Sequence, residues 1–356
     1  MPSLLRSVVR RLGLPLALAA FVTLLATAFA WPTSHVDPRD VPVALTGSST
    51  FVSTTARALD ARAPGAFDIT VAPSEAAGRA MLDDNEVDGL FAQGPAGPRL
   101  VLGAAGRPAV ASLLVSVESE MQRGTTPSLV SYEVPPPRSD PQSAVFTAAA
   151  LPTVLGAIAV GAILASGKRS RHDRLLNTAI VAALSGVGLT LVMDSWLGAL
   201  DGAWWALAGC YALGVGGIVA AINGLTHHFG RVGLVVAAAT VMLLGNPLSG
   251  ATSAPELLPH GWSALGEVLP PGALTNAIRA IAFYDDNGAS SSVLILGAWV
   301  LVGSLLLLVG STTGSGLDRP ATVPEATDPE SVSAAEPKIQ PERIEPHHRI
   351  VRVGHR

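Results

Sequence analysis

The ionisable and nucleophilic side chains of this sequence are few, and none of them forms an arrangement typical of catalysis. Asp194, beside Trp196, is the one carboxylate placed to lie below a membrane surface. A lone acid near the end of an apolar stretch favours a hydrated end group over a proton-coupling site. His227 and His228 have no Cys, Asp or Glu nearby at metal-ligand spacing, which favours interfacial packing. Cys210 is the single cysteine, so an intrachain disulfide or dithiol redox motif is impossible.

Two glycine-containing segments are the candidates for phosphate or anion binding. Gly167 and Lys168 lack the correctly placed earlier glycine of a P-loop, and Arg169 stands where that loop requires Ser or Thr. Residues 47–50 follow an expected strand and open a helix whose free N–H groups could hold an anion. Ordinary helix capping explains the same residues and is the favoured interpretation. With no hydrolase or zinc-protease motif either, we expect no enzymatic activity, no cofactor and no metal site.

The composition of the chain indicates a membrane protein. Of its 356 residues, 49% are hydrophobic and only 14% are charged, and the mean hydropathy is +0.44. A soluble protein of this size usually carries more charge, so the excess apolar surface is expected to face a bilayer. Lys and Arg gather in short segments beside long apolar runs. That pattern sets orientation in a membrane and does not indicate nucleic-acid binding.

Six apolar stretches come near the roughly 20 residues that a helix needs to cross a bilayer core of about 30 Å. They cover residues 13–31, 144–166, 175–198, 203–223, 231–248 and 291–311. The first stretch ends in Ala-Phe-Ala, which also satisfies the small-x-small rule of a signal-peptidase site. Its apolar run is longer than a usual signal h-region, and Trp31 suits an interfacial anchor, so an uncleaved membrane helix is favoured.

The positions of the basic residues predict the topology. Short loops rich in Lys and Arg stay on the cytoplasmic side of a membrane. Three such clusters flank the predicted spans: Arg6, Arg10 and Arg11; Lys168, Arg169, Arg171 and Arg174; and Arg231. Six crossings then give a multi-pass protein of the cell membrane with both termini in the cytoplasm. Residues 32–143 and 249–290 are expected outside.

Residues 32–143 are expected to form a compact extracytoplasmic α/β domain, because short apolar runs alternate with helical spacing. Strands are predicted at 41–45, 67–71, 87–91 and 100–102. Two helices should present the apolar faces Phe51, Thr55, Leu59 and Val110, Leu113, Leu114, Val117, Met121. About 110 residues are enough to bury a core. A proline-rich linker at 135–141 leads into the membrane domain, 144–312, and a disordered cytoplasmic tail is expected at 313–356.

Small residues recur every fourth position along the predicted span 203–223 and just beyond it. Ala208, Ala212, Gly216, Ala220 and Gly224 leave one helix face almost without side chains. Such a face lets another helix approach closely. The partner helix could belong to the same chain or to a second copy in a homodimer, and packing within the chain is favoured.

Residues 249–290 contain two apolar stretches that are too short to cross a bilayer and are interrupted by prolines. The first stretch covers 262–269, and the run Pro270, Pro271, Gly272 separates it from a second short helix at 273–283. In that second helix Arg279 lies off the apolar face. The pattern predicts re-entrant or interfacial helices packed against the bundle.

These blocks resemble the actinobacterial branch of the YhgE/Pip (phage infection protein) membrane proteins, which belong with the ABC exporter permeases of the second type. The resemblance covers almost the whole chain up to residue 312. It is carried by Gly245, Asn246, Pro247, Leu248, Ser249, Gly250; by 255–259; by Leu269, Pro270, Pro271, Gly272, Ala273; by Arg279; and by Phe283, Tyr284, Asp285.

The resemblance implies one membrane helix, a large outer insert and five further helices, with a re-entrant pair between the fifth and sixth. It also implies two copies of the membrane unit and a separate ATPase docked at the loop 167–174, although that loop is brief and lacks an amphipathic coupling helix. The leading hypothesis is a permease-like exporter subunit for a lipidic or amphipathic substrate. The alternative is a non-transporting membrane scaffold or surface receptor that uses 32–143 to bind an envelope component, a secretion partner or a phage. A proton-driven carrier that depends on Asp194 is a third hypothesis.

Overall fold

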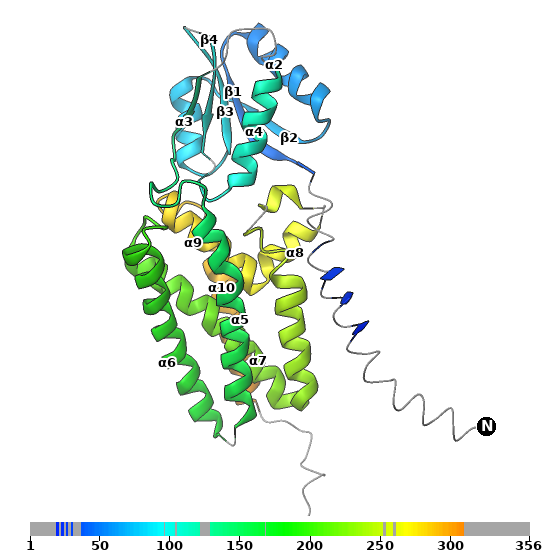
Figure 1. The fold of residues 1–356 in the computed structure, drawn as a ribbon, viewed down its shortest axis with the longest axis vertical. Coiled ribbons are helices and arrows are strands. Elements are labelled where there is room, and N and C mark those ends of the chain that lie inside the picture. Colours follow the sequence, from blue (N-terminus) through cyan, green and yellow to red (C-terminus); the bar gives the residue numbers. More distant parts are fainter. Residues whose placement is uncertain are drawn as a thin grey trace, which may run out of the picture. The chain divides into compact units, whose positions relative to one another are not determined.

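The computed structural model describes residues 37–309, apart from 96, 104, 122–128, 168, 252, 253, 259 and 260. It also describes seven residues near the N-terminus, namely 19, 20, 23, 24, 26, 27 and 30. Most of the first predicted span, 13–31, and the whole predicted tail, 313–356, therefore lie outside the described residues. Within the described part, a five-stranded mixed sheet precedes a set of long helices (Figure 1).

The sheet is built from strands β1 (Val41–Thr46), β2 (Phe67–Val71), β3 (Gly89–Gly94), β4 (Gly97–Leu102) and β5 (Leu129–Tyr132) in the order β2-β1-β3-β4-β5. Strand β1 pairs in parallel with both β2 and β3, β3 pairs antiparallel with β4, and β4 pairs in parallel with β5. The inner strand β1 is almost wholly buried, whereas the edge strand β5 exposes most of its residues. This sheet and its three helices, residues 41–132, are called the sheet domain below.

Side chains that alternate along the strands supply two separate cores. Val41, Val43 and Leu45 of β1 pack with helices α2 (Ser49–Arg62) and α4 (Pro108–Met121). Ala44 points to the other face, where it packs with Leu82 of helix α3 (Glu75–Asp83). Figure 1 shows α2 and α4 on one side of the sheet and α3 on the other. The period of two along a strand therefore produces a three-layer domain.

The predicted strands at 41–45 and 67–71 are confirmed, and the strand predicted at 100–102 is the end of the longer β4. Three further features differ from expectation. The strand expected from 87 begins at Gly89, because Val87 packs in the α3 core and Asp88 turns into a buried ion pair. Helix α3 and strand β5 were not predicted. Helix α3 begins with an N-cap hydrogen bond from the amide of Ala77 to the Ser74 hydroxyl, which fixes its start.

Four helices of the described chain are long and apolar enough to cross a membrane. They are α5 (Ala144–Ser166), α6 with its π-helical end η1 (Arg171–Trp196), α7 with its π-helical end η2 (Trp204–Gly245), and α10 (Ala289–Leu308). Helix α6 carries Leu176, Ile180 and Leu184 in one exposed stripe at four-residue spacing. A soluble protein rarely exposes such a stripe, so these helices are compatible with a membrane location.

The third of these helices is two helical segments joined at Gly230. The backbone of Gly230 has φ 57° and ψ −137°, which is not helical. A Cβ on Gly233 would lie 3.0 Å from the amide nitrogen of Thr226, although seven residues of straight helix rise about 10 Å. The chain therefore turns back on itself near Gly230. The separately predicted spans 203–223 and 231–248 correspond to the two segments.

Helix α7 is the centre of the bundle, since 72% of its most apolar window is buried against 17–28% for the other three. The small-residue face makes this possible. Ala208, Ala212 and Gly216 lie against α6, where a Cβ on Gly186 would be 2.9 Å from the Ala212 Cβ. Ala220 and Gly224 lie against α10, whose Gly303 would place a Cβ 2.6 Å from the Ala221 amide nitrogen. Two helices of the same chain, α6 and α10, therefore pack on the small-residue face of α7.

Between η2 and α10 the chain forms a one-turn helix η3 (Pro255–Leu257) and helices α8 (Trp262–Val268) and α9 (Pro270–Phe283). The break predicted at Pro270 and Pro271 is in fact the first turn of α9. Proline suits that position because its fixed φ is helical and its missing N–H has no partner there. Helix α9 is buried over most of its length and contacts α7 and α10.

Leucine at Gly303 should push α10 away from α7, because the new side chain would meet the Ala220–Ala221 backbone. Overpacking costs about 1–3 kcal/mol, and each kcal/mol lowers Tm by about 2–4 °C in proteins of about 150–250 residues. We expect the Gly303→Leu variant, purified in mild detergent, to unfold about 5–10 °C below wild type.

The matched control is Gly297→Leu on the same helix, where a Cβ meets nothing within 4 Å. Its Tm should stay within about 2 °C of wild type, since the change also removes a helix-weakening glycine. Equal losses in both variants would contradict the assignment of Gly303 as the contact point.

Candidate functional site

An apolar groove runs between α5 and α6, with α7 beneath it. It encloses a cavity of about 770 Å³. We call it the α5–α6 groove. Its lining residues are Val145, Ala148, Ala149, Pro152, Thr153, Gly156, Ala157 and Val160 of α5, Ser185, Gly188 and Leu189 of α6, Val192, Met193 and Leu197 at the end of α6, and Val215 of α7. Because α5 and α6 each pack on α7 more than on one another, the space between them stays open.

Glycine and proline give this groove its width and a flexible wall. A Cβ at Gly156 or Gly188 would meet no atom within 4 Å, so both glycines open onto empty space. Pro152 lies inside α5 and has no N–H to donate to the carbonyl of Ala148. The end of α6 that lines the groove is the π-helical segment η1 (Leu191–Trp196). Such wide turns inside α-helices are frequent at functional sites.

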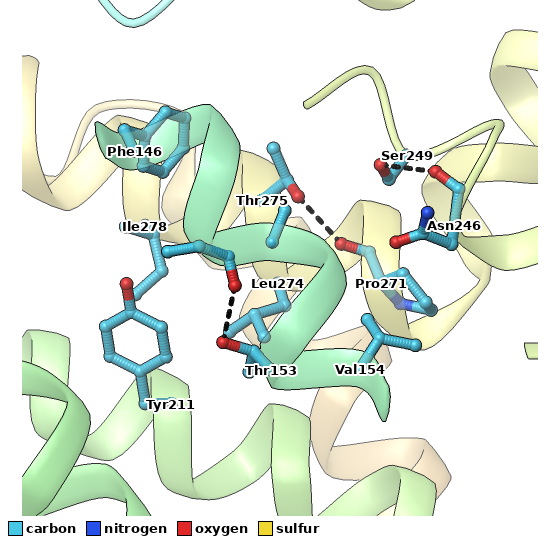
Figure 2. Close-up of a pocket in the computed structure, with 12 residues that line it drawn as sticks. Phe146, Thr153, Val154, Tyr211, Asn246, Ser249, Pro271, Leu274, Thr275 and Ile278 are labelled. Carbon is cyan, nitrogen blue, oxygen red and sulfur yellow. Dashed lines mark hydrogen bonds between the residues drawn. The ribbon is translucent and has the colours of Figure 1, made fainter. Parts of the chain in front are cut away.

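A second, smaller cavity of about 30 Å³ lies on the adjacent face of α5 (Figure 2). We call it the polar pocket. Its oxygen-bearing side chains are those of Thr153, Tyr211, Asn246, Ser249 and Thr275. The remaining lining residues are Phe146, Ala149, Ala150, Val154, Pro271, Leu274 and Ile278. The cavity has room for a water molecule or a group of hydroxyl size, and its described lining contains no charged side chain.

The two cavities meet at one point of α5. Ala149 and Thr153 line both of them. On α7, Tyr211 lines the polar pocket and Val215, one turn further, lines the groove. An apolar groove therefore adjoins, near its middle, a small cavity that also has polar side chains in its lining. The hydroxyls of Thr153, Ser249 and Thr275 donate to backbone carbonyls of Ala149, Asn246 and Pro271, which leaves Tyr211 and Asn246 as the polar groups open to a ligand.

The basic residues predicted to contact an ATPase lie at helix ends. Arg169 donates to the carbonyl of Ile163 at 3.2 Å, and Arg174 donates to those of Ala165 and Gly167, both at 3.1 Å. These carbonyls belong to the end of α5. Arg171 donates to the carbonyl of Leu308 at the end of α10, at 3.1 Å. Lys168 lies outside the described residues. Arginine at a helix C-terminus pairs with unsatisfied carbonyls and with the helix dipole, so the α6 start clamps the ends of α5 and α10.

The helix that corresponds to the predicted span 175–198 begins earlier than expected. Helix α6 starts at Arg171, because Ser170 and Asp173 form a capping box in which each side chain accepts from the other's backbone N–H. The loop between α5 and α6 is consequently shorter than the 167–174 segment inferred from the sequence.

The residues predicted for the re-entrant segment come together around α9. Asn246 and Pro271 line the polar pocket, and Gly245 lies against the Pro271 ring. Gly272 packs on the backbone of Gly266 in α8. Pro270 is buried at the start of α9, and Pro247, next to Asn246, is partly buried. Gly250 has φ 65° and presents its carbonyl to Arg279.

Arg279 links this segment to the sheet domain. It is 2% exposed and donates to the carbonyls of Gly106 and Gly250, each at 3.1 Å, and to the Asn276 amide oxygen at 2.9 Å. Its guanidinium also lies 5.9 Å from the centre of the Phe146 ring. The spacing of the sequence predicted that Arg279 lies off the apolar face of α9. In the structure the sheet domain covers Arg279 on that side.

A charge-balanced cluster continues from Arg279 into the sheet domain. Arg107 pairs with Asp88 at 2.7 Å and approaches Glu256 at 3.9 Å. Tyr284 donates to the carbonyl of Gly103, and its ring centre lies 5.6 Å from the Arg107 guanidinium.

Burial raises the pKa of Asp88 to about 6, although the attraction of Arg107 acts in the opposite direction. Burial also lowers the pKa of Arg279 to about 10. Two buried cations thus balance two acids where the sheet domain meets α9.

Most of the other candidate residues have ordinary structural partners, whereas His227 contacts the His228 ring and its buried Nε2 has no hydrogen-bond partner in the described part of the chain. The Asp194 carboxylate accepts from Ser195 at 3.1 Å, and His228 bonds to the Leu306 carbonyl at 2.7 Å. At residues 47–50, Ser48 is the N-cap of α2 and its own amide donates to Gln93. Cys210 is buried in the bundle. Among the described residues, no group of three His, Cys, Asp or Glu could hold a metal ion.

Sequence reasoning missed Thr153, Tyr211, Gly156 and Gly188 as site residues. Isolated threonine, tyrosine and glycine are common in membrane helices, and these four belong to three helices. Only Pro152 inside a predicted span could have drawn attention to this part of α5. No protein family model, curated protein or solved structure matches the chain.

Replacing Arg279 by methionine should loosen the contact between the sheet domain and α9. The change leaves two buried carbonyls and two acids without this cation, a loss of about 2–5 kcal/mol. We expect amide hydrogen exchange at residues 103–107 to become at least tenfold faster, measured by mass spectrometry on the detergent-purified protein.

Arg62→Met serves as the control, because Arg62 pairs with Glu120 on the exposed surface of the sheet domain. Such surface pairs contribute little, so exchange at 103–107 should not change. Unaltered exchange in Arg279→Met would show that the buried cluster does not hold the two parts together.

Proposed function

We propose that this chain is a permease-like membrane subunit of an ABC-type exporter, which handles a lipidic or amphipathic substrate and works with an ATPase on another chain. The observation that carries the proposal is the α5–α6 groove beside the polar pocket. The proposal includes a homodimer, since exporters of this class use two copies of the membrane unit.

The groove suits the hydrocarbon part of such a substrate. Its lining is almost wholly apolar, and it runs along α5 from Val145 to Val160. Fifteen residues of helix correspond to about 22 Å, against a bilayer hydrocarbon core of about 30 Å. An extended lipid chain in one leaflet therefore fits within its length. The flexible point at Pro152 lets the wall move when the groove fills or empties.

The proposed topology has six crossings, and each terminus lies in the cytoplasm. The predicted helix 13–31 is the first crossing, followed by α5, α6, the two segments of α7, and α10. Arg169, Arg171, Arg174 and Arg231 then lie on the cytoplasmic side, as the positive-inside rule requires. The sheet domain precedes the other end of α5, which puts residues 32–143 outside.

The clamped ends of α5, α6 and α10 are the proposed ATPase contact. Hydrogen bonds from Arg171 and Arg174 join these three helix ends. A rigid junction of this kind could pass a movement of a bound ATPase to both walls of the groove. The likeness to the YhgE/Pip membrane proteins, carried by the segments 245–250 and 269–273, supports the same interpretation.

A second candidate function is a non-transporting scaffold or surface receptor. The observation that favours it is the edge strand β5, which exposes Leu129, Val130 and Tyr132. A cavity of about 390 Å³ lies next to it, between α4 and the proline-rich linker. An open strand edge beside a cleft can bind an extended segment of another protein.

Affinity purification of the tagged full-length protein from native membranes distinguishes the two functions. Recovery of an ATPase together with two copies of this chain is the result expected of a permease. If cross-linked membranes yield envelope or secretion proteins and no ATPase, the scaffold function replaces it.

Leucine at Gly156 or Gly188 should fill the groove without straining the fold, because both positions face open space. We expect either variant to retain at least fivefold less co-purified lipid than wild type, measured by mass spectrometry of lipids extracted from the detergent-purified protein. Gly297→Leu on α10 also faces open space and lies outside the groove. It should retain lipid like wild type, and equal retention in all three variants would contradict a lipid site in the groove.

A further inference from the structure

We propose that the polar pocket binds the uncharged hydroxyl end of a lipid whose chain lies in the α5–α6 groove. The substrate class is thus a neutral long-chain alcohol or a lipid with one free hydroxyl at its polar end. This inference rests on the proposed function, which it deepens by naming the polar group.

Tyr211 supplies the first reason. Its side chain is 5% exposed and lines the polar pocket, yet its hydroxyl has no hydrogen-bond partner among the described residues. The hydroxyl oxygen is not enclosed by protein but opens onto the cavity, so it can donate to and accept from a partner there. The pocket is the space from which that partner must come.

Asn246 supplies a second polar group at the opposite side of the pocket. Its side-chain amide likewise has no hydrogen-bond partner among the described residues. Figure 2 shows this amide beside Pro271, across the pocket from Tyr211. A tyrosine hydroxyl and a carboxamide can both donate and accept. Either of them can bond to a hydroxyl group, which also does both.

The charge of the lining argues against an ionic head group. None of the twelve described residues around the pocket carries a charge. Arg279 lies over the Phe146 ring, and its N–H groups already bond to Gly106, Gly250 and Asn276. A carboxylate or phosphate in this pocket would lose its hydration without gaining an opposite charge.

The size and position of the pocket further limit which ligands can bind there. A volume of about 30 Å³ accepts a hydroxyl and excludes a sugar or a phosphate group. Ala149 and Thr153 separate the pocket from the groove, and Ala149 presents only a methyl group there. Pro152 lies between these two residues and weakens the helix at that turn. The pocket and the groove therefore lie on adjoining sides of this turn of α5.

The test uses two diazirine-bearing probes of one chain length, hexadecanol and hexadecanoic acid. Each probe is cross-linked to the full-length protein in mild detergent at neutral pH, and labelling is quantified by intact-protein mass spectrometry. We expect the alcohol to label more strongly than the acid. Tyr211→Phe should reduce labelling by the alcohol about threefold to tenfold, the effect of one hydrogen bond, and leave labelling by the acid unchanged. The matched control is Tyr132→Phe in the exposed strand β5, which should label like wild type.

Gly156→Leu separates failure of this inference from failure of the proposed function. If Gly156→Leu loses labelling by both probes, the groove is retained as a chain site. If the alcohol and the acid also label wild type equally, the hydroxyl assignment is overturned. The hydroxyl assignment is also overturned if Tyr211→Phe labels like wild type, since the pocket would then hold water only. If Gly156→Leu changes labelling by neither probe, the groove binds no chain and both proposals fall.

Discussion

Close backbone packing along one face of α7 is the constraint on which the rest of the bundle depends. Five small residues, Ala208, Ala212, Gly216, Ala220 and Gly224, let α6 and α10 approach so near that an added Cβ would collide with the opposing chain. Without a hydrophobic driving force between helices in lipid, such contact is what holds a membrane bundle together. Because the helices gather on α7, α5 and α6 need not touch each other along their length, and the groove between them follows.

The segment before α10 completes the site. Asn246 follows the π-helical end of α7, and Pro271 starts α9, so one short stretch of chain closes the polar pocket from the side opposite α5. The same stretch carries Arg279 and Tyr284, whose hydrogen bonds reach Gly106 and Gly103 of the sheet domain. The wall of the pocket and the attachment of the sheet domain are therefore parts of one structural unit.

Local periodicity in the sequence predicted the elements that depend on it. Apolar length located α5 and α10, and alternation located β1 and β2. It missed α3, whose apolar residues are mostly alanine, and β5, which is short and exposed. It placed a break at Pro270 and Pro271, because a proline pair ends one helix as readily as it begins the next. The polar pocket lay beyond this reasoning, since Thr153, Tyr211 and Asn246 meet only through tertiary packing, and six crossings remain a prediction.

The bonds of Arg279 also bear on the order in which this protein is made. Its partner Gly106 precedes it by 173 residues. At about 5–20 residues per second, ribosomes need roughly 10–35 seconds to add that length. During that interval the newly made sheet domain lacks the donors for the carbonyls of Gly106 and Gly103, which come from Arg279 and Tyr284. The last third of the chain therefore completes the hydrogen bonding of the first third, so the sheet domain reaches its final state only after α9 has been made.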